Sequence, residues 1–140
     1  MENKMQYIQT RWLYPLGFFI FISYIIFLAD TADYNFAFRL VGHIPYGDKI
    51  AHTLLYGVMA LLLNYGLGFR YIQYKSISVG YCKGTTPYKL YIQLGAIIVL
   101  TFATLEEFSQ YFIPSRTFDL WDLMADFIGV ILFSFIRIKS

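Results

Sequence analysis

Residues 106–129, EEFSQYFIPSRTFDLWDLMADFIG, join two apolar segments and contain much of the acidic charge of the chain. Pro114 interrupts this stretch, and three aspartates follow it at helical spacing, namely Asp119, Asp122 and Asp126. This spacing places the three carboxylates on one helix face. Charged side chains within apolar segments are costly and usually face a bundle interior or a wet cavity, so this stretch is the first candidate for a functional site.

The composition around this stretch is that of a membrane protein. The chain has 140 residues, of which 58% are hydrophobic and only 14% charged, which is too apolar for a soluble domain of this length. The formal net charge of +2 is too small to suggest a nucleic-acid partner. Cys82 is the only cysteine and has no neighbouring metal ligand at a useful spacing, so we expect no disulfide, metal or cofactor.

Four apolar segments predict four transmembrane helices, because about 20 residues cross a bilayer as a helix. The predicted spans are approximately 12–29, 49–69, 89–111 and 119–137. Helices are favoured because a lipid-exposed backbone must satisfy its own hydrogen bonds, and the segments lack the alternation of a barrel. The predicted fold is therefore all-α: a single domain over residues 1–140, forming an integral membrane four-helix bundle in the cell membrane.

The basic residues predict the orientation of this bundle. They gather before the first span, between the second and third spans, and after the fourth, at Lys4, Arg11, Arg70, Lys75, Lys83, Lys89, Arg137 and Lys139. Both termini should therefore be cytoplasmic, with the acidic cluster facing outward. The connection over residues 30–47 is long enough to be either a lid or a loosely ordered loop. The connection over residues 70–89 is expected to be a basic loop that can touch anionic headgroups.

The second span begins with DKIAHTLLY, in which Asp48, His52 and Tyr56 lie four residues apart and so share a helix face, with Lys49 beside them. An aspartate one turn from a histidine can orient the ring, as expected of a general base, a proton acceptor or a metal ligand. The alternative is structural: Asp48 caps the helix, and His52 is hydrogen-bonded within the bundle.

Glu107 and Gln110 should lie at the same membrane level as His52, and Arg116 follows a proline turn. We expect Arg116 to pair with at least one of Glu107, Asp119 and Asp122. Its guanidinium could lock these carboxylates together or bind a phosphate or carboxylate of a ligand, and both interpretations stay open.

Asp126 is expected to lie deeper than the other candidates. Counted from Arg137 and Arg70, Asp126 lies about 16 Å and His52 about 27 Å from the inner side, at about 1.5 Å per residue. Asp126 should then be too deep to pair with His52 or Lys49, and an unpaired carboxyl group at that depth should be neutral.

Two motifs carry a family resemblance. They are DKxxHxxxY, at Asp48, Lys49, His52 and Tyr56, and ExxQxxxPxRxxxxxD, at Glu107, Gln110, Pro114, Arg116 and Asp122, followed by Gly129. With them, the chain resembles the VanZ-like family of small bacterial membrane proteins. The resemblance implies a cell-envelope protein, since the family's namesake is associated with resistance to teicoplanin. The chain departs from the family at Asp126, where asparagine is more usual, and at Glu106, an additional acid.

Three functions fit this pattern. The first is an outward-facing pocket that binds an anionic lipid-linked or glycopeptide ligand and alters antibiotic susceptibility. Its ligand-binding residues would be Lys49, His52, Tyr56, Glu107, Gln110, Arg116, Asp119, Asp122 and Asp126. The second is an enzyme acting on an outer-leaflet headgroup, with catalytic candidates Asp48, His52, Glu107 and Asp122. The third is a small proton-linked transporter that would use Asp126.

Overall fold

The computed structural model describes residues 2–31, 39, 41–74, 90–114 and 116–136. Its regular elements are, in chain order, α1 (Glu2–Asp30), α3 (Gly47–Gly66), β1 (Tyr71–Tyr74), β2 (Leu90–Gln93), α4 (Leu94–Gln110) and α5 (Leu120–Ser134). Residues 32–38 and 40 of the connection between α1 and α3, and all of residues 75–89 with Cys82, lie outside the described residues. The expectations for those two connections stay predictions.

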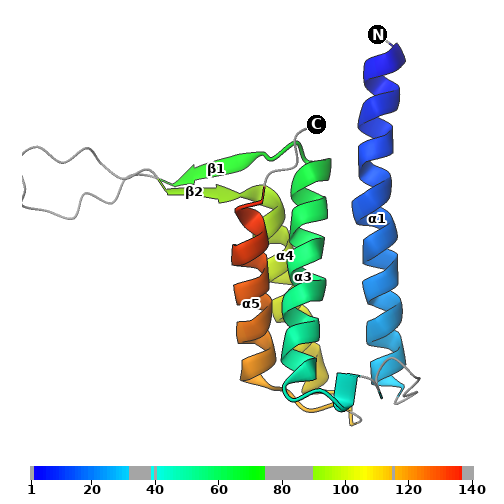
Figure 1. Cartoon of the computed structure of the whole chain (residues 1–140), viewed down its shortest axis with the longest axis vertical. Helices are drawn as coiled ribbons and strands as arrows, with labels where there is room; N and C mark the ends of the chain where they lie inside the picture. The colour runs from blue at the N-terminus through cyan, green and yellow to red at the C-terminus, as the bar shows by residue number, and fades with distance from the viewer. Residues whose placement is uncertain (1, 32–38, 40, 75–89, 115, 137–140) are drawn as a thin grey trace, which may run out of the picture.

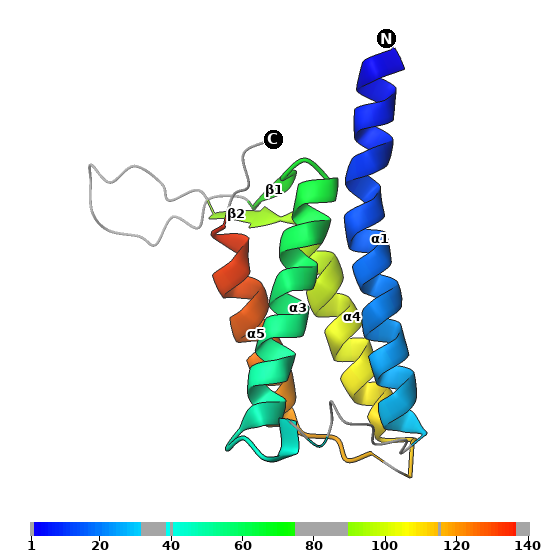
Figure 2. The ribbon, with the colours of Figure 1, turned by 45° about the vertical axis from the view of Figure 1, so that its right-hand side comes forward.

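The four helices run along a common direction and alternate in sense (Figure 1). Helices α3, α4 and α5 pack together, and α1 stands beside α3 and continues beyond the bundle at its N-terminal end (Figure 2). The start of α1 and the end of α5 lie toward the same end of the bundle (Figure 1). The prediction of an all-helical protein with four principal helices is confirmed.

A two-stranded antiparallel sheet lies at that same end, across the helix direction (Figure 1). Tyr71 pairs with Gln93, and Tyr74 pairs with Leu90. The prediction of a helix from residue 89 is therefore wrong at its start, because α4 begins only at Leu94. The segments YIQY and LYIQ are rich in aromatic and aliphatic residues that favour strands. The mean hydropathy of a short segment does not distinguish such a strand from a helix.

One helix in the described part of the chain, over Thr10–Asp30, is long and apolar enough to cross a membrane by length and composition. Helices α4 and α5 have only 17 and 15 residues. At 1.5 Å per residue, α5 is about 22 Å long, which is shorter than a hydrocarbon core of about 30 Å. All four predicted crossings therefore stay predictions.

Helices α3 and α5 pack very closely because small residues face each other. A β-carbon added to Gly129 would clash with the backbone carbonyl of Thr53, and one added to Gly57 would lie 2.6 Å from the ring of Phe133. The Thr53 hydroxyl lies 3.1 Å from the carbonyl oxygen of Ala125 on α5. Small side chains allow two helix backbones to approach in this way. The close approach sets which polar side chains of the two helices meet.

We predict that Gly129→Val destabilises the bundle, because its added β-carbon meets the Thr53 backbone, which cannot rotate away. Overpacking of this kind costs about 1–3 kcal/mol or more. The matched control is Gly17→Val, because a β-carbon at Gly17 of α1 meets nothing within 4 Å. Thermal unfolding in detergent would compare the two variants, and equal midpoints would contradict the close packing of α3 and α5.

Candidate functional site

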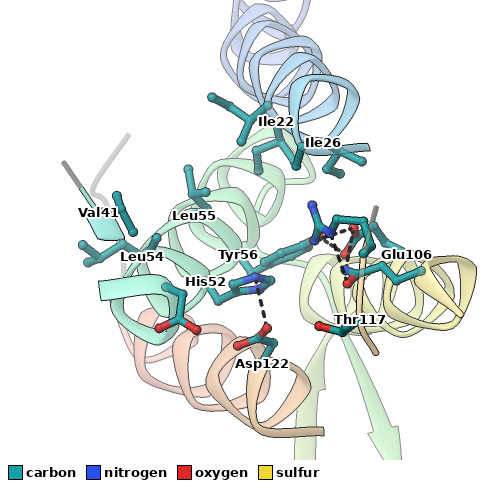
Figure 3. A pocket seen from close by; sticks show the side chains of 16 residues that line it. Ile22, Ile26, Val41, His52, Leu54, Leu55, Tyr56, Glu106, Thr117 and Asp122 are labelled. Carbon is teal, nitrogen blue, oxygen red and sulfur yellow. Dashed lines mark hydrogen bonds and ion pairs between the residues drawn. The ribbon is translucent and has the colours of Figure 1, made fainter. Parts of the chain in front are cut away.

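The ends of α1 and α4 and the starts of α3 and α5 lie together at the end of the bundle opposite the sheet (Figure 2). Polar side chains of these four helix ends contact one another there. A cavity of about 550 Å³ lies among them. Ile22, Ile26 and Leu55 form an apolar wall, and His52, Glu106 and Asp122 lie on the other side (Figure 3). The rest of its polar lining consists of Asp48, Tyr56, Gln110, Arg116 and Thr117. The cavity thus has an apolar part and a charged part.

Lys49 is bound by three carboxylates. Its ammonium nitrogen lies 2.8 Å from Asp48, 2.7 Å from Asp119 and 2.6 Å from Asp122, so the start of α3 is tied to the start of α5. Asp119 also caps α5, because its carboxylate accepts a hydrogen bond of 2.9 Å from the backbone N–H of Trp121. The hydrogen bond from Lys49 holds the pKa values of Asp48 and Asp119 below their usual range.

His52 is paired with Asp126, with 2.9 Å between Nδ1 and Oδ1. The expectation that Asp126 is too deep to meet His52, and hence unpaired, is therefore wrong. The two helices meet at their first turns, where Lys49 contacts Asp119 and Asp122, and α5 is five residues shorter than α3 (15 against 20). A depth counted from their far ends therefore does not compare equivalent positions. His52 lies five residues after Gly47, and Asp126 six after Leu120, so the two are level.

The expectation that Asp48 orients His52 is also corrected, because the carboxylate hydrogen-bonded to the ring is that of Asp126. Asp48 pairs with Lys49 instead, and it does not cap α3, whose N-cap residue is Tyr46. The ring of His52 stacks on Tyr56, with centroids 5.9 Å apart, as their shared helix face predicted. Its Nε2 lies 3.9 Å from Asp122, which is too long for a hydrogen bond.

The contacts of His52 allow it to accept a proton. Asp126 is completely buried, and its carboxylate can accept a hydrogen bond from Nδ1–H of the ring. In that tautomer, Nε2 is an acceptor beside a cavity that His52 lines. A carboxylate on one ring nitrogen and an available second nitrogen form the arrangement of a general base.

Glu106, Gln110 and Tyr56 form a second polar cluster. The hydroxyl of Tyr56 donates to Glu106 over 3.2 Å, and the amide of Gln110 donates to Glu106 over 3.0 Å. The Gln110 carbonyl accepts a hydrogen bond of 3.3 Å from Nε of Arg116. Glu106, an additional acid relative to the family motif, is thus a cavity residue. Its position one turn before Gln110 was the available sequence signal.

Glu107 has a different role from Glu106. It is completely buried and does not line the cavity. One carboxylate oxygen accepts a hydrogen bond of 2.8 Å from the backbone N–H of Asp119, and the other accepts one of 3.1 Å from Gln110. Glu107 therefore joins the end of α4 to the start of α5.

Arg116 does not pair with Glu107, Asp119 or Asp122 as expected. Its terminal nitrogens lie 3.8 Å from Glu106 and 4.0 Å from Asp30. The three expected partners are already engaged by Lys49 or by amide groups, which leaves Arg116 to face α1 and Glu106. Asp30 had no signal in the sequence that connected it to this cluster, because only folding brings the end of α1 to Arg116.

The fold and the site define a class of small helical proteins with charged side chains inside the bundle and an apolar helix that suggests membrane association. The chain matches the VanZ/LLP1 family over residues 2–138 and belongs to that family. No curated protein and no solved structure matches it. In the described residues, no group of three or more histidine, cysteine, aspartate or glutamate side chains could hold a metal ion.

We predict that Lys49→Met destabilises the protein by about 2 kcal/mol, less than for a fully buried ion pair because Asp48 and Asp119 are partly exposed. The pH dependence should also change. Carboxylates with lowered pKa values stabilise the folded state above their unfolded pKa, near 4, and that stability is lost as the pH falls below it. The parent should therefore lose stability below about pH 4.

In Lys49→Met the same acidification should be neutral or stabilising, because Asp48 and Asp119 lose the cation that lowers their pKa values. Melting temperatures of both proteins measured between pH 3 and 7 test this. Parallel curves for the two proteins would mean that Lys49 does not hold these carboxylates in their charged form.

Proposed function

We propose that this VanZ-family chain is a multi-pass protein of the cell envelope, with both termini cytoplasmic and the polar end of the bundle facing outward. In this proposal the cavity binds an anionic lipid-linked or glycopeptide ligand. The observation that carries it is the division of one cavity into an apolar wall and a polar end that contains Arg116. Such a division fits an amphipathic molecule, and a volume of about 550 Å³ is in the usual range of ligand pockets.

The distribution of polarity supports a lipid environment for the whole bundle. Large apolar side chains are exposed on α3, α4 and α5, for example Leu54, Leu105 and Ile131, each more than half exposed. Glu107 and Asp126 are completely buried. Soluble proteins bury apolar side chains and rarely bury charged ones, so the reversed pattern favours a bundle surrounded by lipid. Helices α4 and α5 are shorter than the hydrocarbon core is thick. They would require local thinning of the bilayer, or flanking side chains that extend to its polar surfaces.

Arg116 is the cation best placed for an anionic ligand. It lines the cavity, and its contacts of 3.8 and 4.0 Å to Glu106 and Asp30 are longer than hydrogen bonds. Its terminal N–H groups can therefore donate to a phosphate or carboxylate in a bidentate manner. Lys49, expected beside Arg116 in this role, does not line this cavity and is held by three carboxylates. Its role in this proposal is structural.

A change in glycopeptide susceptibility would follow if the ligand is a lipid-linked molecule of the cell wall, because binding would withhold that molecule from the antibiotic or from wall synthesis.

The enzyme interpretation is the second candidate. It is favoured by the pairing of His52 with Asp126 at the cavity wall. A proton-linked transporter has weaker support, because Asp126 is paired with His52 and does not line the cavity.

The orientation is testable with Cys82, the only cysteine of the chain. We predict that a membrane-impermeant maleimide leaves Cys82 unlabelled in intact cells and labels it after the membrane is opened, because the basic connection should be cytoplasmic. A Cys82→Ser variant controls for labelling of other proteins. Ready labelling from outside would reverse the orientation and turn the cavity toward the cytoplasm.

Ligand binding is testable by native mass spectrometry of the purified protein with phosphatidylglycerol. Ile26→Trp should weaken binding at least tenfold by filling the cavity, and Arg116→Gln should do the same by removing the anion contact. Leu132→Trp, on an exposed position of α5, is the matched control and should bind as the parent does. Equal binding by all four proteins would reject the cavity as the site. Chemical conversion of the lipid by the parent, lost in His52→Gln, would support the enzyme.

A further inference from the structure

The polar end of the bundle contains far more acidic than basic side chains. Seven carboxylates of the described residues form one connected cluster: Asp30, Asp48, Glu106, Glu107, Asp119, Asp122 and Asp126. Lys49 and Arg116 are the permanently cationic members. Arg39, in the described part of the preceding connection, is exposed and pairs with none of these seven. Glu107 and Asp126 are completely buried. If both are neutral, five carboxylates of the cluster remain against two cations, a surplus of three.

Part of this acidic surplus lines the cavity. Asp48, Glu106 and Asp122 line the cavity, and Arg116 is the permanently cationic residue in its described lining. Asp48 is largely exposed, but the side chains of Asp122 and Glu106 are only 14% and 6% exposed. Carboxylates in such a poorly hydrated position require compensation by cations or hydrogen-bond donors. A ligand that brings only negative charge would meet Arg116 but would add to the repulsion. A ligand that also brings positive charge would relieve it.

We infer that the cavity selects a lipid whose headgroup carries a primary ammonium group next to a phosphate, with the phosphate on Arg116, the ammonium on Asp122 and Asp48, and the acyl chains along the apolar wall. This inference rests on the proposed function, in that the cavity binds a lipid through Arg116, and it revises the charge of the headgroup. It replaces a purely anionic headgroup by one that bears both charges.

The contacts of Lys49 show how this cluster binds an ammonium group. Its nitrogen is held by oxygens of Asp48, Asp119 and Asp122 at 2.6–2.8 Å. Asp122 uses Oδ1 for Lys49, and its Oδ2 has only the 3.9 Å contact to His52. Asp48 uses Oδ2 for Lys49, and its carboxylate is otherwise largely open, with 58% of the side chain exposed. Two carboxylate oxygens of cavity residues are therefore available to N–H donors.

A primary ammonium matches these oxygens better than a quaternary one. It has three N–H donors, as Lys49 does, whereas a trimethylammonium group has none. Quaternary ammonium groups are typically bound by aromatic cages. Tyr56 and His52 are the aromatic residues of the cavity lining, and they are stacked on each other rather than arranged as a cage. The carboxylates therefore favour ethanolamine-type over choline-type headgroups.

The test compares three lipids with identical acyl chains: phosphatidylethanolamine, phosphatidylcholine and phosphatidylglycerol. Binding to the purified full chain is measured by native mass spectrometry. We expect phosphatidylethanolamine to bind at least tenfold more tightly than either of the others. Asp122→Asn should remove that preference, and Arg116→Gln should weaken the binding of all three. Because Asp122 also holds Lys49, Asp48→Asn, at a position with a 58% exposed side chain, provides a second and milder variant.

The outcomes separate the inference from the function on which it rests. Phosphatidylglycerol bound as tightly as phosphatidylethanolamine, with both sensitive to Ile26→Trp, would overturn the inference and leave the proposed function standing. Equal binding of the ethanolamine and choline lipids would also overturn it, because N–H donation would then be irrelevant. A preference unchanged in both Asp122→Asn and Asp48→Asn, with melting temperatures near the parent's, would reject these two carboxylates as the ammonium site. No binding of any of the three lipids would overturn both proposals.

Discussion

The close approach of α3 and α5 is the constraint on which the polar end of the molecule depends. Gly57 and Gly129 leave no room for a β-carbon, so the two backbones meet at Thr53. This contact fixes the relative level of the two helices. It brings Lys49 to Asp119 and Asp122, and His52 to Asp126 one turn further on. A small shift along the helix axis would leave buried charges without partners, which is costly in a poorly hydrated interior.

The remaining helices join this pair through polar contacts at the same end. Glu107 binds the backbone at the start of α5, and Arg116 faces both Glu106 on α4 and Asp30 on α1. Such a network specifies one arrangement of the helices, because each buried charged group requires its own partner. In a lipid environment, the polar cluster would therefore specify the fold as well as line the cavity.

Lys49 and Arg116 illustrate how similar charges take different roles. Lys49 is a compact ammonium with three short ion pairs, and its charge is fully compensated by acids of α3 and α5. Arg116 follows a proline and keeps longer contacts, so its planar guanidinium remains suited to binding a group in the cavity. His52 resembles Arg116 in this respect, since Asp126 holds one ring nitrogen and the other lies beside the cavity.

The sequence alone determined the helical class, the family and most of the residues that gather at the polar end. Apolar segments and charged residues at helical spacing are local signals that survive without tertiary contacts. The register between helices is different, because it depends on backbone contacts such as that of Gly129 with Thr53 and on helix lengths that hydropathy does not fix. Only the tertiary structure could therefore pair His52 with Asp126, assign Asp30 and Glu106 to Arg116, and convert the first turn of the predicted third helix into β2.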